Sequence, residues 1–270
     1  MDKDKKVIAP FTIPDYRVVR PRIYFEKGSD TMISSQQLTI FTINDCKVSF
    51  ITPNSVSMLL NKSWKEYEAA ERIYTELIKP EMVKGQSFDV PFEDLSKLYD
   101  YLEHIQASII TIYSSVEALS NVAIPSDFQL TKKNSKGVKE VWTKENIEQW
   151  TPTEEKIGKI VPDILGIENP KHQPFWERFI ELKKIRDAII HQKQSTTNSN
   201  EIESFFLKTL FDESIFKKIL AGFDLIKYYC RMKDSHTYFP ILTDLFRCDV
   251  NFIDSFDSAL KVAPDGPQMK

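Results

Sequence analysis

The feature that most constrains this chain is a stretch, residues 92–124, whose apolar positions repeat with the period of an α-helix. Its apolar side chains are spaced alternately by three and four residues, at Leu102, Ile105, Ile109, Ile112, Val116, Leu119 and Ala123. At about 100° of rotation per residue, these positions form one continuous helix face. The stretch ends before Pro125, which disfavours helical backbone in the residue that precedes it. The pattern predicts a long amphipathic helix in a mainly α-helical protein.

Other parts of the chain have the same periodicity. With 41% hydrophobic residues and only seven glycines among 270 residues, the chain can build a compact and ordered core. The predicted helices cover Ser57–Lys79, Phe92–Ile124, Phe175–His191, Ile202–Lys233 with a break near Asp212, and Ile241–Lys261.

The first sixty residues have a different pattern. Two β-favouring runs flank Asn44-Asp45 within Leu38–Ile51, which predicts a hairpin with a tight turn. Arg22–Glu26 predicts a further short strand. The sequence therefore predicts an extension with a small β-hairpin at residues 1–56, a helical domain at 57–235, and a C-terminal helix and tail at 236–270.

Residues 126–174 lack a clear period, and we expect this region to be irregular. Within it, the stretch TKKNSKGVK (Thr131–Lys139) is rich in lysine and contains a glycine. This stretch is interpreted either as a solvated loop or as a loop that contacts phosphate. The adjacent carboxylates Glu154 and Glu155 lie in a polar context, and we expect them to face solvent.

Composition excludes several classes of protein. A net charge of −3 and a pI of about 5.9 are not typical of a protein that coats nucleic acid through bulk charge, so any such role would need a local patch. The three cysteines, Cys46, Cys230 and Cys248, are far apart and form no CxxC motif, which favours reduced thiols in a cytoplasmic protein. The start of the chain does not read as a signal peptide, and no apolar run approaches 18 residues, so we expect no membrane span.

The sequence also has no pattern typical of a metal or nucleotide site. Walker A, GxGxxG and GxSxG motifs are absent from it. Three of its histidines, His104, His172 and His236, do not form a metal-ligand spacing with cysteines or carboxylates. We therefore expect neither a metal ion nor a cofactor.

Arg186 occupies an unusual position in the predicted helix Phe175–His191. Counting about 100° per residue from Phe175, Phe179 lies at about 40°, Leu182 at about 340° and Arg186 at about 20°. The arginine is therefore predicted to lie near the centre of the apolar stripe. A buried guanidinium without a partner is destabilising by several kcal/mol, so it needs one.

Two explanations for Arg186 stay open at this point. The first is a buried ion pair with Glu117, which lies in a polar stripe with Ser114 and Asn121 on the long helix. The second is a functional site shared with His191 at the predicted helix end. Five residues separate Arg186 and His191, a rotation of about 140°, so an ideal helix does not point both side chains at one spot. A loosened last turn or a two-fold dimer could bring them together.

At these residues the sequence resembles the HEPN superfamily, the higher-eukaryote and prokaryote nucleotide-binding domains. The family motif is an arginine, a polar residue, a short apolar spacer and a histidine, which RDAIIH matches from Arg186 through Asp187 to His191. The stretch YSSVEALSNVAIP is similar to the family's second helix, with Glu117 as its acidic residue and Asn121 as its amide. The resemblance covers about residues 92–233 and does not reach the N-terminal extension.

The resemblance implies an up-and-down four-helix bundle that often forms a homodimer. Many family members are metal-independent endoribonucleases in toxin–antitoxin and phage-defence systems, and others only bind a partner or act as a scaffold. The implied partners are therefore an RNA substrate, a second copy of the chain, and an antitoxin or regulatory protein. One toxin subgroup has a tyrosine two residues after the histidine, where this chain has Lys193. A mode that depends on modifying this tyrosine is therefore not supported here.

The resemblance also implies roles for the motif residues. The ribose 2′-hydroxyl would attack its own phosphate and leave a 2′,3′-cyclic phosphate and a 5′-hydroxyl. His191 suits proton transfer, because the pKa of histidine lies near 6.5, and Arg186 suits charge stabilisation on the phosphate. Asp187 would orient His191 or a water, Glu117 would hold Arg186, and Asn121 would support them.

Two hypotheses remain. In the first, the protein is an HEPN-type endoribonuclease. In the second, it is a non-catalytic HEPN-like module that dimerises or binds a nucleotide or a partner protein. An open cleft that both Arg186 and His191 reach favours the first hypothesis. A sealed pair of Arg186 with Glu117, with His191 directed into solvent, favours the second.

Overall fold

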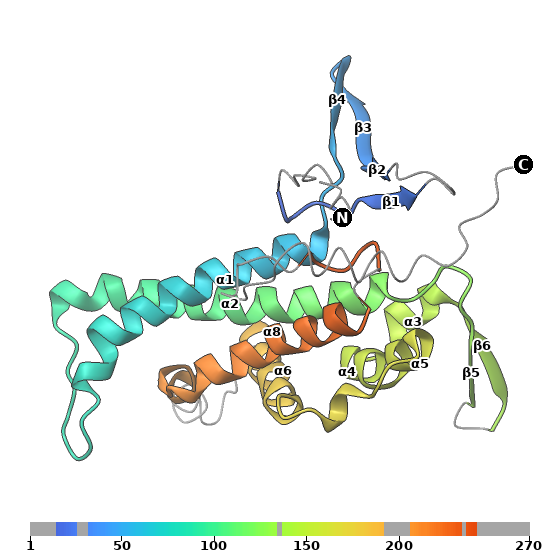
Figure 1. The fold of residues 1–270 in the computed structure, drawn as a ribbon. Helices are drawn as coiled ribbons and strands as arrows, with labels where there is room; N and C mark the ends of the chain where they lie inside the picture. Colours follow the sequence, from blue (N-terminus) through green and yellow to red (C-terminus); the bar gives the residue numbers. More distant parts are fainter. Residues whose placement is uncertain (1–14, 26–31, 134–136, 192–205, 234–235, 242–270) are drawn as a thin grey trace, which may run out of the picture.

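The computed structural model describes residues 15–25, 32–133, 137–191, 206–233 and 236–241 (Figure 1). Within these ranges the protein is mainly α-helical, as the sequence predicts, and small two-stranded sheets accompany the helices. The long helices are α1 (Ser55–Ile73), α2 (Leu95–Val122), α6 (Trp176–Ile190) and α8 (Ser214–Met232).

Helices α1 and α2 lie side by side along much of their lengths. Small side chains allow this close approach, because Ser63 and Ser108 are completely buried at the contact. Each serine hydroxyl donates to the backbone carbonyl of the other residue, at 2.9 and 3.0 Å. Ser115 is also buried and donates to the carbonyl of Val56 at 2.9 Å. These buried polar groups are therefore satisfied, and they join the two helices without long side chains.

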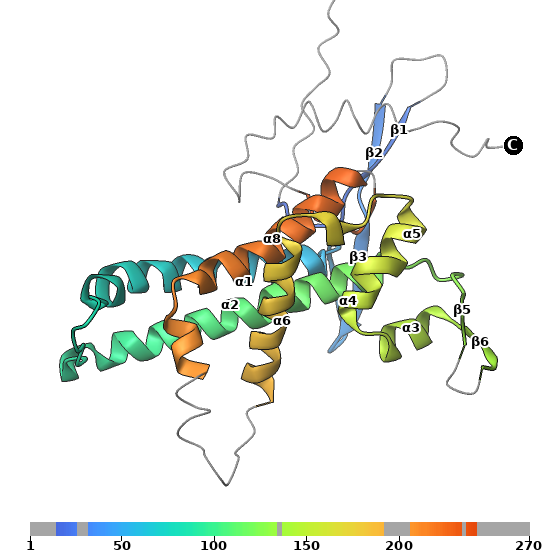
Figure 2. The ribbon, with the colours of Figure 1, turned by 90° about the horizontal axis from the view of Figure 1, so that it is seen from below.

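Helix α6 crosses the other long helices instead of running alongside them. Figure 2 shows α1, α2 and α8 in similar directions, with α6 at a steep angle to them. Gly222 of α8 lies at this crossing. A Cβ atom at Gly222 would lie 2.6 Å from Ile112 Cγ1 and 3.3 Å from Leu182 Cδ2, so glycine permits the close contact among α2, α6 and α8. The steep crossing departs from the nearly parallel helices of an up-and-down bundle.

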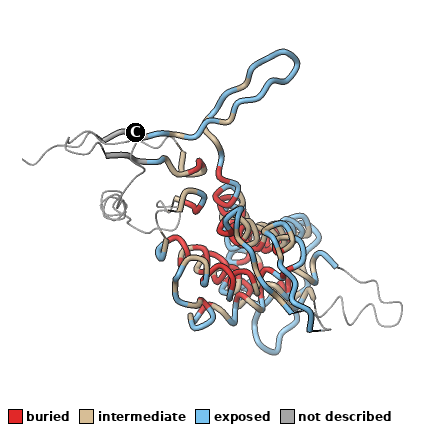
Figure 3. The backbone as a smooth tube through the Cα atoms, turned by 90° about the vertical axis from the view of Figure 1, so that its right-hand side faces the viewer, coloured by how far each residue is buried: buried red, intermediate tan, exposed pale blue. Residues whose placement is uncertain are grey.

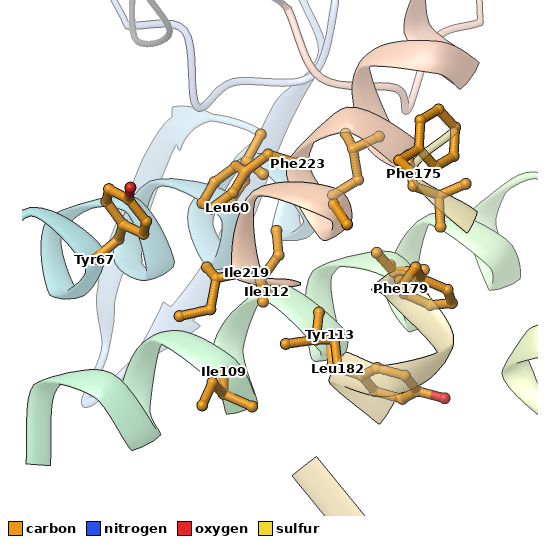
Figure 4. Close-up of a cluster of buried hydrophobic side chains, with 14 of the residues drawn as sticks. Leu60, Tyr67, Ile109, Ile112, Tyr113, Phe175, Phe179, Leu182, Ile219 and Phe223 are labelled. Atoms are coloured by element: carbon orange, nitrogen blue, oxygen red, sulfur yellow. The ribbon is translucent and has the colours of Figure 1, made fainter. Parts of the chain in front are cut away.

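The hydrophobic core lies where the four long helices meet. Figure 4 shows Phe179 and Leu182 of α6 beside Ile112 and Tyr113 of α2, with Ile219 of α8 nearby. All five residues are at most 1% exposed. The apolar stripe that the sequence predicts on the long helix is buried at Ile105, Ile109, Ile112, Val116, Leu119 and Ala123, whereas Leu102 is only partly buried.

Two helix boundaries differ in detail from the predictions. Helix α1 begins at Ser55, because the side chain of Asn54 caps it by accepting from the backbone N–H of Ser57. It continues as a π-helical turn over Tyr74–Ile78 and a 3₁₀ turn over Lys79–Glu81. The predicted break near Asp212 is confirmed, since residues 206–211 are helical and α8 begins at Ser214.

The N-terminal part contains two antiparallel hairpins. Strands β1 (Arg22–Phe25) and β2 (Met32–Ser35) form one, and β3 (Leu38–Ile43) and β4 (Cys46–Ile51) form the other. The predicted turn at Asn44-Asp45 is confirmed, and both residues have positive φ angles, 48° and 60°, as a type I′ turn requires. The β3–β4 hairpin stands away from the helices in Figures 1 and 3.

The region 126–174 is more ordered than the sequence predicts. It contains a hairpin of β5 (Leu130–Lys133) and β6 (Lys139–Trp142), helix α3 (Lys144–Trp150), the short helices α4 (Thr153–Glu155) and α5 (Val161–Leu165), a π-helical turn (Lys156–Ile160) and a 3₁₀ turn (Pro170–His172). These segments are too short to show a helical period. Local signals such as the capping box of Thr143 and Asn146 define them instead. Of the lysine-rich stretch, residues 134–136 lie outside the described ranges.

Some predictions concern residues that the structure does not describe. The predicted helix Ile241–Lys261 lies outside the described ranges after its first residue, and so does Cys248. Among the described cysteines, Cys46 is exposed and Cys230 is buried, and both are free thiols. Within the described ranges no helix is both long and apolar enough to cross a lipid bilayer.

Candidate functional site

Arg186 lies at the edge of the buried face of α6 and not at its centre. The buried residues of this helix are Phe179, Leu182 and Ile185. Ile190, at about 60° on the same helical count from Phe175, is 51% exposed. The buried face therefore ends before the last turn, and the side chain of Arg186 is 19% exposed. The prediction that Arg186 lies near the centre of the stripe is corrected in this respect.

Among the described residues, the guanidinium of Arg186 has two partners, and Glu117 is not one of them. Its Cζ atom lies 4.0 Å from the centre of the Tyr113 ring on α2, which is a cation–π contact. Its Nη1 atom lies 3.0 Å from Oδ1 of Asp187, the next residue along the helix. The predicted ion pair with Glu117 is absent among the ion pairs of the described residues. The Tyr113 ring therefore holds the Arg186 guanidinium on one side, while part of the Arg186 side chain stays accessible to solvent.

Tyr113 provides the floor of this arrangement. The residue is 1% exposed, and its ring stacks on Phe179 with 5.8 Å between centroids and an interplanar angle of 3°. The side chain of Thr153 lies next to the Tyr113 hydroxyl. Burial raises the pKa of the Tyr113 hydroxyl, so this group stays neutral near pH 7. A neutral, stacked ring provides a rigid surface for the guanidinium.

A second cation, Lys183, lies one turn before Arg186 on α6. Its ammonium lies 3.0 Å from Oε1 of Glu154 and 3.6 Å from Oδ2 of Asp187. The hydrogen bond to Glu154 raises the pKa of Lys183. Asp187 thus lies between two cations. Its Oδ2 atom contacts Lys183, and its Oδ1 atom contacts Arg186.

The prediction that Glu154 and Glu155 face solvent is wrong for Glu154. Only 31% of the Glu154 side chain is exposed, and its Oε2 atom is buried and has no hydrogen-bond partner among the described residues. Glu155 is 38% exposed and lies 3.0 Å from Nζ of Lys132. The cause is tertiary: α4 lies against α2 and brings Thr153 and Glu154 to Tyr113 and Lys183.

Glu117 and Asn121 belong to a different cluster, around Lys156. Asn121 accepts a hydrogen bond from Nζ of Lys156 at 2.7 Å, and the Lys156 residue is only 1% exposed. Burial lowers the pKa of Lys156, and the negative charges of Glu117 and Glu148 oppose this shift. The polar stripe on α2 is therefore real, but it serves a buried lysine in the π-helical turn and not Arg186.

His191 ends helix α6 and is exposed. Its backbone leaves the helical conformation, with φ −106° and ψ 45°, although its N–H still donates to the carbonyl of Asp187 at 2.9 Å. Asp187 therefore supports His191 through the backbone, while its carboxylate contacts Arg186 and Lys183. The side chain of His191 faces solvent next to the exposed Ile190.

The structure thus brings together some of the predicted site residues. Arg186 and Asp187 are in contact, His191 follows one turn later, and Glu117 and Asn121 lie in the separate Lys156 cluster. Sequence reasoning missed Tyr113, Thr153, Glu154 and Lys183. No local signal connects Tyr113 to Arg186, because their contact depends on how α6 crosses α2.

Metal binding has no visible basis in the described part of the chain. There, no group of three or more histidines, cysteines or carboxylates is arranged to hold a metal ion. Comparisons with protein-family models, curated proteins and solved structures found no match for this chain. Any functional assignment therefore depends on the site itself.

Proposed function

We propose that the protein is a metal-independent endoribonuclease of the HEPN type that acts in a toxin or phage-defence system. The proposal depends on the motif from Arg186 to His191, and one observation carries it. The guanidinium of Arg186 contacts a buried ring, with Cζ 4.0 Å from the ring centre, yet the side chain stays 19% exposed, five residues before an exposed histidine. A permanent cation in a rigid but accessible position suits the binding of a phosphate.

In this proposal, each group has a definite role. The Arg186 guanidinium would stabilise the charge that develops on the phosphate oxygens when the ribose 2′-hydroxyl attacks. His191 would transfer the proton, and such acid–base catalysis typically contributes about 10²- to 10⁴-fold. Tyr113 and Asp187 would position Arg186, since both contact it directly.

The motif of a single chain provides only one histidine, His191, for a reaction that needs both a base and an acid. A homodimer, in which the two motifs face each other, would provide the second. The end of α6 is compatible with such a contact, because the apolar side chain of Ile190 is 51% exposed beside His191. We therefore include a two-fold dimer of an HEPN-like bundle in the proposal.

The test is RNA cleavage by the purified protein without added metal and in the presence of a chelator. Wild type should produce fragments that end in 2′,3′-cyclic phosphate. His191→Ala and Arg186→Ala should each lower the rate by about 100-fold or more. Lys184→Ala is the matched control, because Lys184 is an exposed cation on the same helix. Circular dichroism should show that all the variants are folded.

Cleavage that is unchanged in His191→Ala would overturn the proposal. Induced expression in bacteria gives a second readout, since only wild type and Lys184→Ala should arrest growth and fragment cellular RNA. Equal growth and intact RNA with all four proteins would contradict the toxin role.

A non-catalytic HEPN-like module is the second candidate, and one observation favours it. Asp187 and Tyr113 already partner Arg186 within one chain, so the cation needs no ligand to be stable. This candidate predicts that purified wild type never cleaves RNA. It also predicts that Arg186→Ala lowers thermal stability without changing any cleavage.

A further inference from the structure

The β3–β4 hairpin exposes a large apolar surface that the proposed ribonuclease function does not explain. Five of its large hydrophobic side chains are between 42% and 57% exposed: Leu38, Ile40, Phe41, Ile43 and Phe50. Half-exposed side chains of this size each leave on the order of 100 Å² uncovered. Figure 3 shows this hairpin as an exposed ribbon that extends away from the buried core.

One face of the hairpin is the more aromatic. The register pairs Phe41 with Val48 and Ile43 with Cys46, and side chains alternate between faces, so these four residues share a face with Phe50. The rings of Phe41 and Phe50 contact edge to face, with centroids 6.0 Å apart. An isolated two-stranded hairpin is at best marginally stable in water. We therefore expect another apolar segment to pack on this aromatic face.

The low charge of the hairpin limits the kinds of molecule that can bind its aromatic face. From Leu38 to Ile51 the hairpin carries one acidic residue, Asp45, and one basic residue, Lys47. It therefore has no cationic surface for nucleic acid or for anionic lipid headgroups. An apolar protein segment is the occupant that fits.

The root of the hairpin, where β4 continues into Thr52 and Asn54, lies beside the last described residues of the chain. Asn54, just after β4, donates from its side chain to the carbonyl of Tyr238 at 2.9 Å. Arg20 donates to the carbonyls of Phe239 and Pro240, at 3.0 and 2.6 Å. Val19 in turn donates to the carbonyl of Thr52, directly after β4. The segment that follows α8 is thus fixed at the foot of the hairpin, and the description ends there, at residue 241.

The sequence beyond this point has the composition of a cover. Residues 242–261 contain four aspartates and a set of large apolar side chains at helical spacing: Leu242, Leu245, Phe246, Ile253, Phe256 and Leu260. Twenty residues span about 30 Å even as a helix, whereas a six-residue strand is about 20 Å long. The segment can therefore reach from the root of the hairpin to its tip.

We propose that residues 242–261 of the same chain dock on the aromatic face of the β3–β4 hairpin and shield it from solvent. The anchor at Arg20 and Asn54 holds the start of this segment at the hairpin root. The high local concentration that results favours docking within one chain over docking of a second copy. This inference is independent of RNA cleavage.

Native cysteines provide the experiment. Cys46 lies on the aromatic face and is exposed in the described residues, whereas Cys230 is buried and its pKa is raised to about 12. In a full-length Cys248→Ser background, Cys46 is therefore the reactive thiol. Its rate with a disulfide reagent should be at least about tenfold slower in the folded protein than in the urea-unfolded protein, because access requires the segment to open.

Two full-length variants test which segment provides the protection. Ile253→Asp combined with Phe256→Asp should abolish the protection of Cys46, because charged side chains oppose apolar docking. Ser255→Asp combined with Ser258→Asp adds the same charge at polar positions, and it should leave the protection intact.

Three results would overturn the proposal. The first is a Cys46 that reacts in the folded protein as fast as in the unfolded one. The second is protection that the Ile253 and Phe256 substitutions do not change. The third is protection that increases with protein concentration, which would assign the cover to a second copy.

Discussion

Two cations at the edge of the same helical core, Lys156 and Arg186, have very different surroundings. The Lys156 residue is 1% exposed and donates its hydrogen bond to a neutral amide, Asn121. The Arg186 side chain is 19% exposed and has an aromatic ring and a carboxylate as partners. Sequence periodicity pointed to Arg186 as the buried cation, yet Lys156 is the one that is fully buried. The comparison teaches that a stripe position does not by itself determine how a charge is solvated.

The difference also separates structural from functional roles. A fully buried lysine has no access to a ligand, so its contribution is to join the π-helical turn (Lys156–Ile160) to α2. A partly exposed arginine on a rigid ring can contact a ligand. Substitutions at Lys156, Arg186 and Tyr113 distinguish these two roles.

Lys156→Ala should destabilise the protein most. The substitution removes a buried stem and leaves the Asn121 carbonyl without its donor, which should lower the free energy of unfolding by about 2–5 kcal/mol. Urea denaturation monitored by circular dichroism measures the change. Lys156→Met is the matched control, because it keeps the volume and removes the charge, and its loss should be much smaller. Equal losses in both variants would show that the charge matters more than the packing.

The stability contribution of Lys156 should depend on pH in a defined direction. Burial lowers its pKa in the folded state below the ordinary value of 10.5, so the unfolded state binds more protons between these two values. The free energy of unfolding of wild type, minus that of Lys156→Met, should therefore increase as pH rises toward 10.5 and level off above it. Subtracting the variant removes the tyrosine titrations that both proteins share. A flat difference across this range would contradict the buried cation.

Arg186→Ala should have a moderate effect on stability. It removes the cation–π contact with Tyr113 and the partly exposed ion pair with Asp187, together about 1–2 kcal/mol. Thermal denaturation compares it with Arg186→Lys, which keeps the charge but lacks the planar guanidinium that contacts the Tyr113 ring. A loss as large as that of Lys156→Ala would mean that Arg186 is a core residue, and it would weaken the ribonuclease proposal.

Tyr113→Phe should have the smallest effect of the series. The ring that contacts Arg186 and its stacking on Phe179 stay in place, and only the polar contact of the hydroxyl with Thr153 is lost, which is worth at most about 0.5–1 kcal/mol. Tyr113→Ala is the contrasting variant, because it removes the ring and leaves a cavity beside Phe179. If the phenylalanine variant lost as much stability as the alanine variant, the hydroxyl and not the ring would be the support of Arg186.

Much of the fold could be predicted from the sequence, because its signals are local. The apolar spacing in residues 92–124 predicted α2, and Asn44-Asp45 predicted the turn between β3 and β4. The same local reasoning failed in residues 126–174, where elements of three to seven residues are too short for a period to develop. It also missed α4, whose residues Thr153 and Glu154 complete the surroundings of Tyr113 and Lys183.

The candidate site also has a part that local sequence predicts and a part that depends on contacts between helices. The motif from Arg186 to His191 lies within one helix and its end, so the sequence alone was enough to single it out. Tyr113, which contacts Arg186, and Asn121, which contacts Lys156, both come from α2, and neither contact could be inferred from spacing along the chain. Glu117 and Asn121 were correctly identified as a polar stripe, but they were assigned to the wrong cation.

The positions of the long helices and of the β3–β4 hairpin follow from local sequence, since backbone hydrogen bonding and apolar periodicity act over a few residues. Only the tertiary structure decided which charges are buried and what they contact. The physical reason is that burial depends on the angle at which helices cross. The steep crossing of α6 over α2 places Tyr113 under Arg186, and the packing of the π-helical turn on α2 brings Lys156 to Asn121.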